Sequence, residues 1–199
     1  DHITSITEDH LGYIWVGTAG GGLNRFDKQT QSFQTIPLNF KNKQQSLFIT
    51  SLLLDHNKQL WVTSGNARLR PSHTNGGIFK VDPKSLTSSQ IIPNTETKVI
   101  ENINDFNSIF EDKDNNIWFG TLGHGLLKKQ ADSLEFSQHF EDIITDQNTI
   151  LDIIQDAAGY LWFSTRYSGI YTLDPSNYNI INYNSSTHAT SNLRDNDIT

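Results

Sequence analysis

The chain has 199 residues, a formal net charge of −7 and no cysteine. The missing thiols exclude disulfides, cysteine-based zinc and iron–sulfur sites and thiol nucleophiles, and the dispersed acidic charge argues against nucleic acid or an anionic membrane surface as a partner. No run approaches the ~18–20 apolar residues of a membrane span. Because the chain lacks Met and begins at Asp1, we expect a processed chain or a piece of a longer protein.

Four tryptophans reveal an internal repeat. An Asp lies six residues before each Trp, and apolar residues lie three and six positions before each Asp. A hydroxyl residue follows each Trp by three positions, and a Gly followed by Leu or Ile comes next. The Asp and Trp pairs are Asp9 and Trp15, Asp55 and Trp61, Asp112 and Trp118, and Asp156 and Trp162.

Each repeat is predicted to form four short strands. In the first repeat these strands cover residues 3–8, 13–18, 22–27 and 32–36. A period of roughly 40–50 residues with one Trp per unit is typical of propeller blades, each a four-stranded antiparallel sheet. No segment has the sustained 3.6-residue periodicity of a helical solenoid. The predicted fold is therefore an all-β propeller array of four blades at about 1–46, 47–103, 104–147 and 148–195, with a fifth repeat beginning at 196–199.

The repeated Asp is predicted to cap the turn between the first two strands of each blade. Asp side chains accept hydrogen bonds in such turns, and Gly12 and Gly159 can supply the positive φ that the turn requires. Four equivalent carboxylates on separate blades lie too far apart for paired acid–base catalysis. The small residue two positions after each Trp suits the crowding where blades converge; these residues are Gly17, Thr63, Gly120 and Ser164.

Three patterns resemble functional sites but lack residues or spacings that those sites require. Residues 112–116 resemble the start of a calcium loop, but Ile117 stands where Gly is needed and Gly123 where a bidentate Glu is needed. The glycines at 20–22 lack the Lys and the helix of a phosphate-binding loop. The seven His residues show no metal-ligand spacing. We predict no catalytic residue, no metal and no cofactor in this segment.

Residues 3–27, with Asp9, Trp15 and the three glycines, resemble the two-component regulator propeller repeat. The resemblance covers all four repeats. Repeat two departs by Thr63 and a nine-residue insertion, and repeat four departs by Ser164. The resemblance implies a segment of a larger propeller, from the periplasmic sensor region of a membrane-anchored bacterial protein such as a hybrid histidine kinase. The kinase, and any contact with the membrane, would then lie outside this segment.

The connections between the second and third strands differ from repeat to repeat and are predicted to share one face. Function concentrates on such loops when a rigid scaffold holds them. Arg offers a planar fork of donors and Tyr a stacking plane, which suit a sugar, an acidic sugar or a carboxylate. The alternative is a solvated loop that binds nothing. The candidate ligand-binding residues are Arg68, Arg70, His73 and Asn75 in the insertion, with His124, Arg166 and Tyr167.

The predicted function is a sensor segment without enzymatic activity. It would bind a small molecule, such as an oligosaccharide, and relay the event to a distant output domain. An interaction or assembly module is one alternative, since fold does not imply function, and a propeller lyase-type enzyme is another. If both ends of the array expose blade faces, two copies would associate as a homodimer through them.

Overall fold

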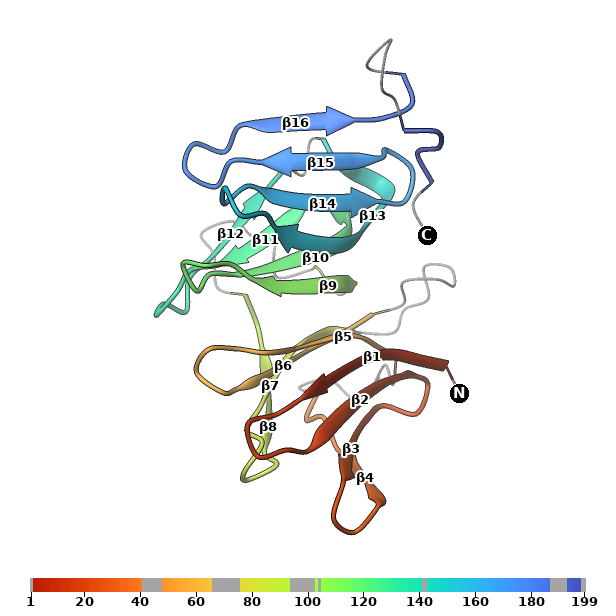
Figure 1. Ribbon diagram of the computed structural model, residues 1–199, viewed down its shortest axis with the longest axis vertical. Helices are drawn as coiled ribbons and strands as arrows, with labels where there is room; N and C mark the ends of the chain where they lie inside the picture. Colours follow the sequence, from red (N-terminus) through yellow and green to blue (C-terminus); the bar gives the residue numbers. More distant parts are fainter. Residues whose placement is uncertain are drawn as a thin grey trace. The chain divides into compact units, whose positions relative to one another are not determined.

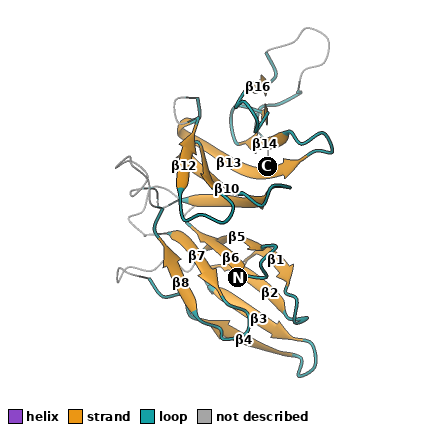
Figure 2. Cartoon of the chain, turned by 90° about the vertical axis from the view of Figure 1, so that its left-hand side faces the viewer, coloured by secondary structure: helices purple, strands orange, loops and turns teal. Residues whose placement is uncertain are grey.

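The computed structural model describes residues 2–40, 48–65, 76–93, 103, 105–140, 143–186 and 193–197, with only the backbone at 145–147. These residues form sixteen strands and no helix (Figure 2). All the strand pairings are antiparallel. The chain divides into two compact units, residues 1–107 and 108–199, which we describe separately.

The first unit contains two four-stranded sheets (Figure 1, red to yellow). Blade 1 comprises β1 (His2–Glu8), β2 (Ile14–Ala19), β3 (Leu23–Asp27) and β4 (Ser32–Ile36), hydrogen-bonded in that order. Blade 2 repeats the order with β5 (Ile49–Leu54), β6 (Leu60–Ser64), β7 (Gly77–Val81) and β8 (Ser88–Ile91). We call the link between the first and second strands of a blade the AB turn, and the following links the BC connection and the CD turn.

The second unit contains blades 3 and 4 (Figure 1, green to blue). Blade 3 comprises β9 (Phe106–Glu111), which begins in the first unit, β10 (Ile117–His124), β11 (Leu126–Lys129) and β12 (Phe136–His139). Blade 4 comprises β13 (Thr145–Gln155), β14 (Leu161–Thr165), β15 (Ile170–Leu173) and β16 (Ile180–Tyr183). The array of four-stranded antiparallel blades is the fold class that the sequence predicts.

The structure adds a link between blades 3 and 4 that the repeat pattern does not predict. Strand β10 continues to His124 and pairs with the early part of β13, with Leu122 opposite Thr149 and His124 opposite Thr145. The two blades therefore share one eight-stranded sheet. At the corresponding place in the first unit, the described residues form a single bridge between Ala19 and Phe48.

Within each unit, the Trp of one blade packs on the next blade. Buried Trp15 belongs to one cluster with Ile49 and Leu52 of blade 2, and buried Trp118 to another with Ile150 and Ile153 of blade 4. This packing confirms the prediction that Trp and the first-strand apolar residues fill the space between blades.

The approach between blades is close enough to require glycine at two of the small positions. A Cβ added at Gly17 would lie 2.7 Å from Ile49 Cγ2, and one at Gly120 would lie 2.2 Å from Ser108 Oγ and 2.7 Å from Ile150 Cγ2. All three distances are too short for real atoms, so a larger side chain at either position would force its neighbours to move. The predicted crowding is confirmed at these positions.

The outer faces of blades 1 and 4 are uncovered. Ile3 and Ile6 are 69% and 66% exposed, although their counterparts Ile49 and Leu52 are buried. On blade 4, Trp162 is half-buried whereas Trp15 is fully buried, and Ile154 beside it is exposed. Such faces are the surfaces that an adjoining blade covers in a longer array.

The predicted fifth repeat at 196–199 lies partly outside the described residues. None of the described residues belongs to a helix long and apolar enough to cross a membrane.

Candidate functional site

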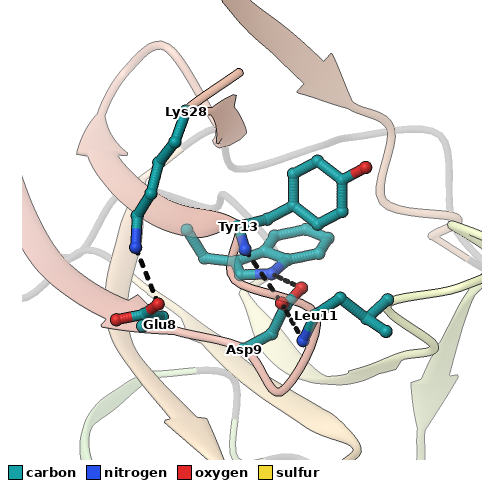
Figure 3. A network of polar contacts seen from close by, with 6 residues as sticks. Glu8, Asp9, Leu11, Tyr13 and Lys28 are labelled. Carbon is teal, nitrogen blue, oxygen red and sulfur yellow. Dashed lines mark hydrogen bonds and ion pairs between the residues drawn. The ribbon is translucent and has the colours of Figure 1, made fainter. Parts of the chain in front are cut away.

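The repeated Asp residues are fully engaged at the AB turns. One carboxylate oxygen of each accepts a hydrogen bond from the indole of the Trp six residues later. The Nε1–Oδ2 distances are 2.7 Å for Asp9, 2.7 Å for Asp55, 2.8 Å for Asp112 and 2.9 Å for Asp156. In Figure 3 the other oxygen of Asp9 accepts backbone N–H groups from Leu11 at 2.8 Å and Tyr13 at 3.1 Å.

This geometry confirms the predicted capping role and adds the indole bond, which the sequence analysis missed. Gly12 and Gly159 have φ of 88° and 97°, as predicted, while Lys58 and Asn115 take the same conformation in blades 2 and 3. Both carboxylate oxygens are therefore committed to the turn, and none of the four Asp residues is available for chemistry.

The pKa of the Asp156 carboxyl is lowered, chiefly because the Trp162 indole donates a hydrogen bond to it. Three CD-turn residues follow the same logic. Backbone N–H groups lower the pKa of Asp27 and of Asp82, and the Ser176 hydroxyl has the largest effect on the pKa of Asp174. Hydrogen bonds to a carboxylate favour its charged form, so these groups stabilise turns as anions.

The hydroxyl residue three positions after Trp closes the BC connection. The hydroxyls of Thr18, Thr121 and Thr165 donate to the carbonyl of the Gly four residues later at 2.9, 2.7 and 2.9 Å. The backbone N–H groups of His124 and Ser168 in turn donate to the hydroxyls of Thr121 and Thr165. The sequence pattern contains these hydroxyls but does not reveal this role.

The predicted site residues fall into two groups. Arg68, Arg70, His73 and Asn75 belong to the segment 66–75, which lies outside the described residues. His124, Arg166 and Tyr167 are described, and all three lie in the second unit.

His124 is exposed at the end of β10. Its backbone is fixed on two sides: the N–H donates to Thr121 Oγ1 at 3.2 Å, and the carbonyl accepts from Gln138 Nε2 at 3.0 Å. The imidazole is carried on a rigid backbone and faces no metal-binding group of three or more His, Cys, Asp or Glu among the described residues.

Arg166 and Tyr167 form the tip of the BC connection of blade 4. The Arg166 guanidinium carbon lies 5.3 Å from the centroid of the Tyr167 ring, and Tyr167 is 51% exposed. The Arg166 N–H donates to the carbonyl of Thr149 at 3.0 Å. The Tyr167 N–H donates to Asn148 Oδ1 at 3.1 Å.

Strand β13 brings these residues to one end of the sheet. It pairs with β10 along one edge and with β14 along the other. His124 therefore lies on one side of β13, and the Arg166–Tyr167 tip lies on the other. His124 lies opposite Thr145 and Arg166 bonds to Thr149, so the two sides are also offset by four residues along β13. Among the described residues, no hydrogen bond joins His124 to Arg166 or Tyr167.

Asn148 is the site residue that the sequence analysis missed. Its side chain is only 7% exposed. Besides accepting from Tyr167, it donates from Nδ2 to Ser168 Oγ at 2.7 Å, so it holds the whole tip. A signal for it exists: Asn recurs two residues before the first-strand apolar residue at positions 104, 148 and 196. Position 104 lies outside the described residues, and Asn196 Oδ1 accepts a backbone N–H from Ser185.

Three segments match the family model described as two component regulator propeller, residues 1–20, 101–123 and 146–167. No protein in the curated set matches the chain. The extracellular domain of a proposed one component system from B. thetaiotaomicron matches with a TM-score of 0.73 at 18% identity, over 98% of this chain and 24% of that chain.

Two further structures share the fold. The extracellular domain of a proposed hybrid two component system from B. thetaiotaomicron matches with a TM-score of 0.68 at 21% identity, over 98% of this chain and 23% of that one. The GH74 enzyme of Niastella koreensis matches with a TM-score of 0.66 at 15% identity, over 90% of this chain and 29% of that one. The chain thus spans less than a third of the length of each. The chain has a β-propeller fold, and three of its segments are similar to the two-component regulator propeller repeat.

Proposed function

We propose that this segment is a ligand-sensing, extracytoplasmic part of a bacterial two-component signalling protein. The observation that carries the proposal is the match of three of its repeats to the two-component regulator propeller model. The similarity to extracellular domains of two signalling systems supports the same compartment and role. In this proposal the segment itself has no enzymatic activity, and the membrane anchor and the output domain, such as a histidine kinase, lie elsewhere in the protein.

The proposed binding site is the BC end of blades 3 and 4. A small molecule, with oligosaccharides as the first class to test, would contact Arg166, Tyr167 and His124. The saturated hydrogen bonding of the connection supports this role, because a rigid scaffold loses little conformational freedom when a ligand binds. The uncovered apolar faces of blades 1 and 4 are proposed to pack on adjoining blades of the same protein. In the isolated segment they would favour a homodimer.

A second candidate is an enzyme, because a GH74 enzyme shares the fold. Glycoside hydrolysis generally requires a pair of available carboxylates. The recurrent Asp residues of this chain do not offer one, since both oxygens of Asp9 and of Asp112 accept hydrogen bonds within the AB turns. The recurrent Asp residues therefore lend no support to a glycosidase mechanism.

The test uses the complete extracytoplasmic region and a panel of oligosaccharides. Calorimetry measures binding, and product analysis of the same samples measures turnover. The sensor proposal expects saturable, stoichiometric binding of one compound with no product, and a change in output of the full-length protein when that compound is added. Product formation would favour the enzyme. Binding of no small molecule, together with a specific protein partner, would favour the interaction module.

A further inference from the structure

Among the described residues, two Arg–Tyr pairs differ in their hydrogen bonding. In blade 1 the Arg25 guanidinium carbon lies 4.1 Å from the centroid of the Tyr13 ring. Its nitrogens donate to the carbonyl of Pro83 at 3.4 Å and to Gln34 Oε1 at 3.2 Å, so Arg25 ties blade 1 to blade 2. In blade 4 the Arg166 guanidinium lies over Tyr167 at 5.3 Å, and it donates a hydrogen bond to no described residue. The first pair is structural, and the second is not used by the fold.

Three successive backbone N–H groups around Arg166 already have acceptors. The N–H groups of Arg166, Tyr167 and Ser168 donate to Thr149, Asn148 and Thr165. The Ser168 carbonyl accepts from Asn182 Nδ2 at 2.8 Å, and the Asn148 amide is occupied at both its oxygen and its nitrogen. The charged group of this tip that donates to no described residue is the Arg166 guanidinium, which lies beside the exposed Tyr167 ring.

The Arg166 guanidinium and the Tyr167 ring together favour one class of ligand. A neutral sugar presents hydroxyls that act as both donors and acceptors, and proteins usually meet them with amides and carboxylates as well as cations. Here the Asn148 amide nitrogen and oxygen both bond to the tip. A guanidinium offers donors alone, in a fork that matches a carboxylate, and such charge-assisted pairs are roughly twice as strong as neutral hydrogen bonds. No described acidic side chain forms an ion pair with Arg166.

We propose that the Arg166–Tyr167 tip binds the carboxylate of a small acidic ligand. The guanidinium holds the carboxylate, and the exposed Tyr167 ring packs against the apolar side of the adjoining group. This inference rests on the proposed function and narrows the ligand at its site to an acid. The carboxylate can belong to a sugar acid or to a simple organic acid, and the probes below separate these two sources.

The experiment titrates the complete extracytoplasmic region with three probes: trigalacturonate, its neutral counterpart galactotriose, and succinate. If the carboxylate belongs to a sugar acid, trigalacturonate binds at least tenfold more tightly than galactotriose and succinate binds weakly. If a simple acid is sufficient, succinate binds comparably. In either case raising the salt concentration weakens binding, because an exposed ion pair is screened.

Variants locate the binding on the tip. Arg166→Ala is expected to weaken the affinity for the bound acid by about ten- to a hundredfold, the usual size of a lost hydrogen bond to a charged group. Arg166→Lys keeps the charge but loses the fork, so it restores only part of the affinity. Arg194→Ala removes an exposed cation of the same unit and serves as the charge-matched control, with an unchanged affinity expected.

The outcomes separate this inference from the proposed function. Binding of galactotriose as tight as that of trigalacturonate, with no effect of Arg166→Ala, overturns the acid-binding inference and leaves the sensor proposal standing. Failure of both acidic probes to bind also overturns the inference. If the full oligosaccharide panel then gives neither binding nor a change in output, the sensor proposal fails as well.

Discussion

The two ends of the blades differ in how closely their connections repeat from blade to blade. At the AB end, every blade repeats one hydrogen-bonded unit, in which an Asp carboxylate joins a Trp indole to the turn. At the BC end, a hydroxyl closes the connection in the same way, but the residues at the tip differ: Ala19 to Gly21 in blade 1 and Arg166 to Ser168 in blade 4. The contrast teaches that the repeat keeps a hydrogen-bonded frame at both ends, fixes the length of the AB turn and leaves the BC connection free to vary in length.

The largest expected effect comes from removing a Trp indole at the AB end. Trp118 is fully buried in the cluster between blades 3 and 4, so Trp118→Ala should lower the free energy of unfolding of that unit by about 3–5 kcal/mol. Urea denaturation measures this loss. Trp162→Ala is the matched control, because Trp162 is half-buried and its loss should destabilise the protein much less. Equal losses would contradict the packing described here.

Removing the carboxylate should have the next largest effect. Asp112→Ala leaves the Trp118 indole and the backbone N–H groups of Asp114 and Asn116 without their acceptor, which should cost about 2–3 kcal/mol. Denaturation of the variant measures this loss, and fluorescence of the tryptophans should shift as the indole loses its partner. Asp114→Ala, at an exposed position of the same turn, should change stability by less than about 0.5 kcal/mol.

The hydrogen bonds that hold the BC connection of blade 4 are expected to contribute less to the free energy of unfolding than those of the AB turn. Asn148→Ala removes the bonds to the Tyr167 N–H and to Ser168 Oγ, at an estimated loss of about 1–2 kcal/mol. Exposed Asn57→Ala should be nearly neutral in the same denaturation series. A loss for Asn148→Ala as large as that for Asp112→Ala would break the contrast between the two ends.

One buried group near the site should be dispensable. The hydroxyl of Thr149, a residue only 1% exposed, has no hydrogen-bond partner among the described residues. An isosteric apolar side chain avoids the cost of burying that group, so Thr149→Val should raise stability by up to about 1 kcal/mol. Thr165→Val is the contrasting control: its hydroxyl bonds to Gly169 and Ser168, and its loss should be destabilising. Calorimetric melting of the two variants should therefore move in opposite directions.

The smallest expected effect is a pH dependence from the exposed turn carboxylates. The pKa of Asp156 is lowered below its unfolded value of about 3.8. Its contribution to stability is therefore fully present above that pH and is lost as the pH falls through the lower, folded value. Denaturation between pH 7 and pH 3 should show stability declining below about pH 4, with a shallower decline in Asp156→Asn. A decline that begins near neutrality would point to other groups.

Much of this arrangement follows from residues close together in the chain. The Asp and its Trp are six residues apart, and the hydroxyl and its Gly acceptor are four residues apart in three of the four blades. Such local bonds recur with the repeat, so the blades and the role of Asp9 in its turn could be predicted from sequence. The indole bond escaped prediction because a Trp in a repeat is equally well explained by packing alone.

The geometry of the candidate site depends on contacts between residues that lie far apart in the sequence. Sequence alone identified Arg166, Tyr167 and His124 as variable polar residues on one predicted face. The pairing of β10 with β13 was decided by the tertiary structure, as was the burial of Asn148 beneath the tip. The physical reason is that strand pairing joins segments through generic backbone groups, which leave little trace in side-chain identity. Only the folded sheet shows that the Asn148 amide bonds to the tip and that the Arg166 guanidinium donates to no described residue.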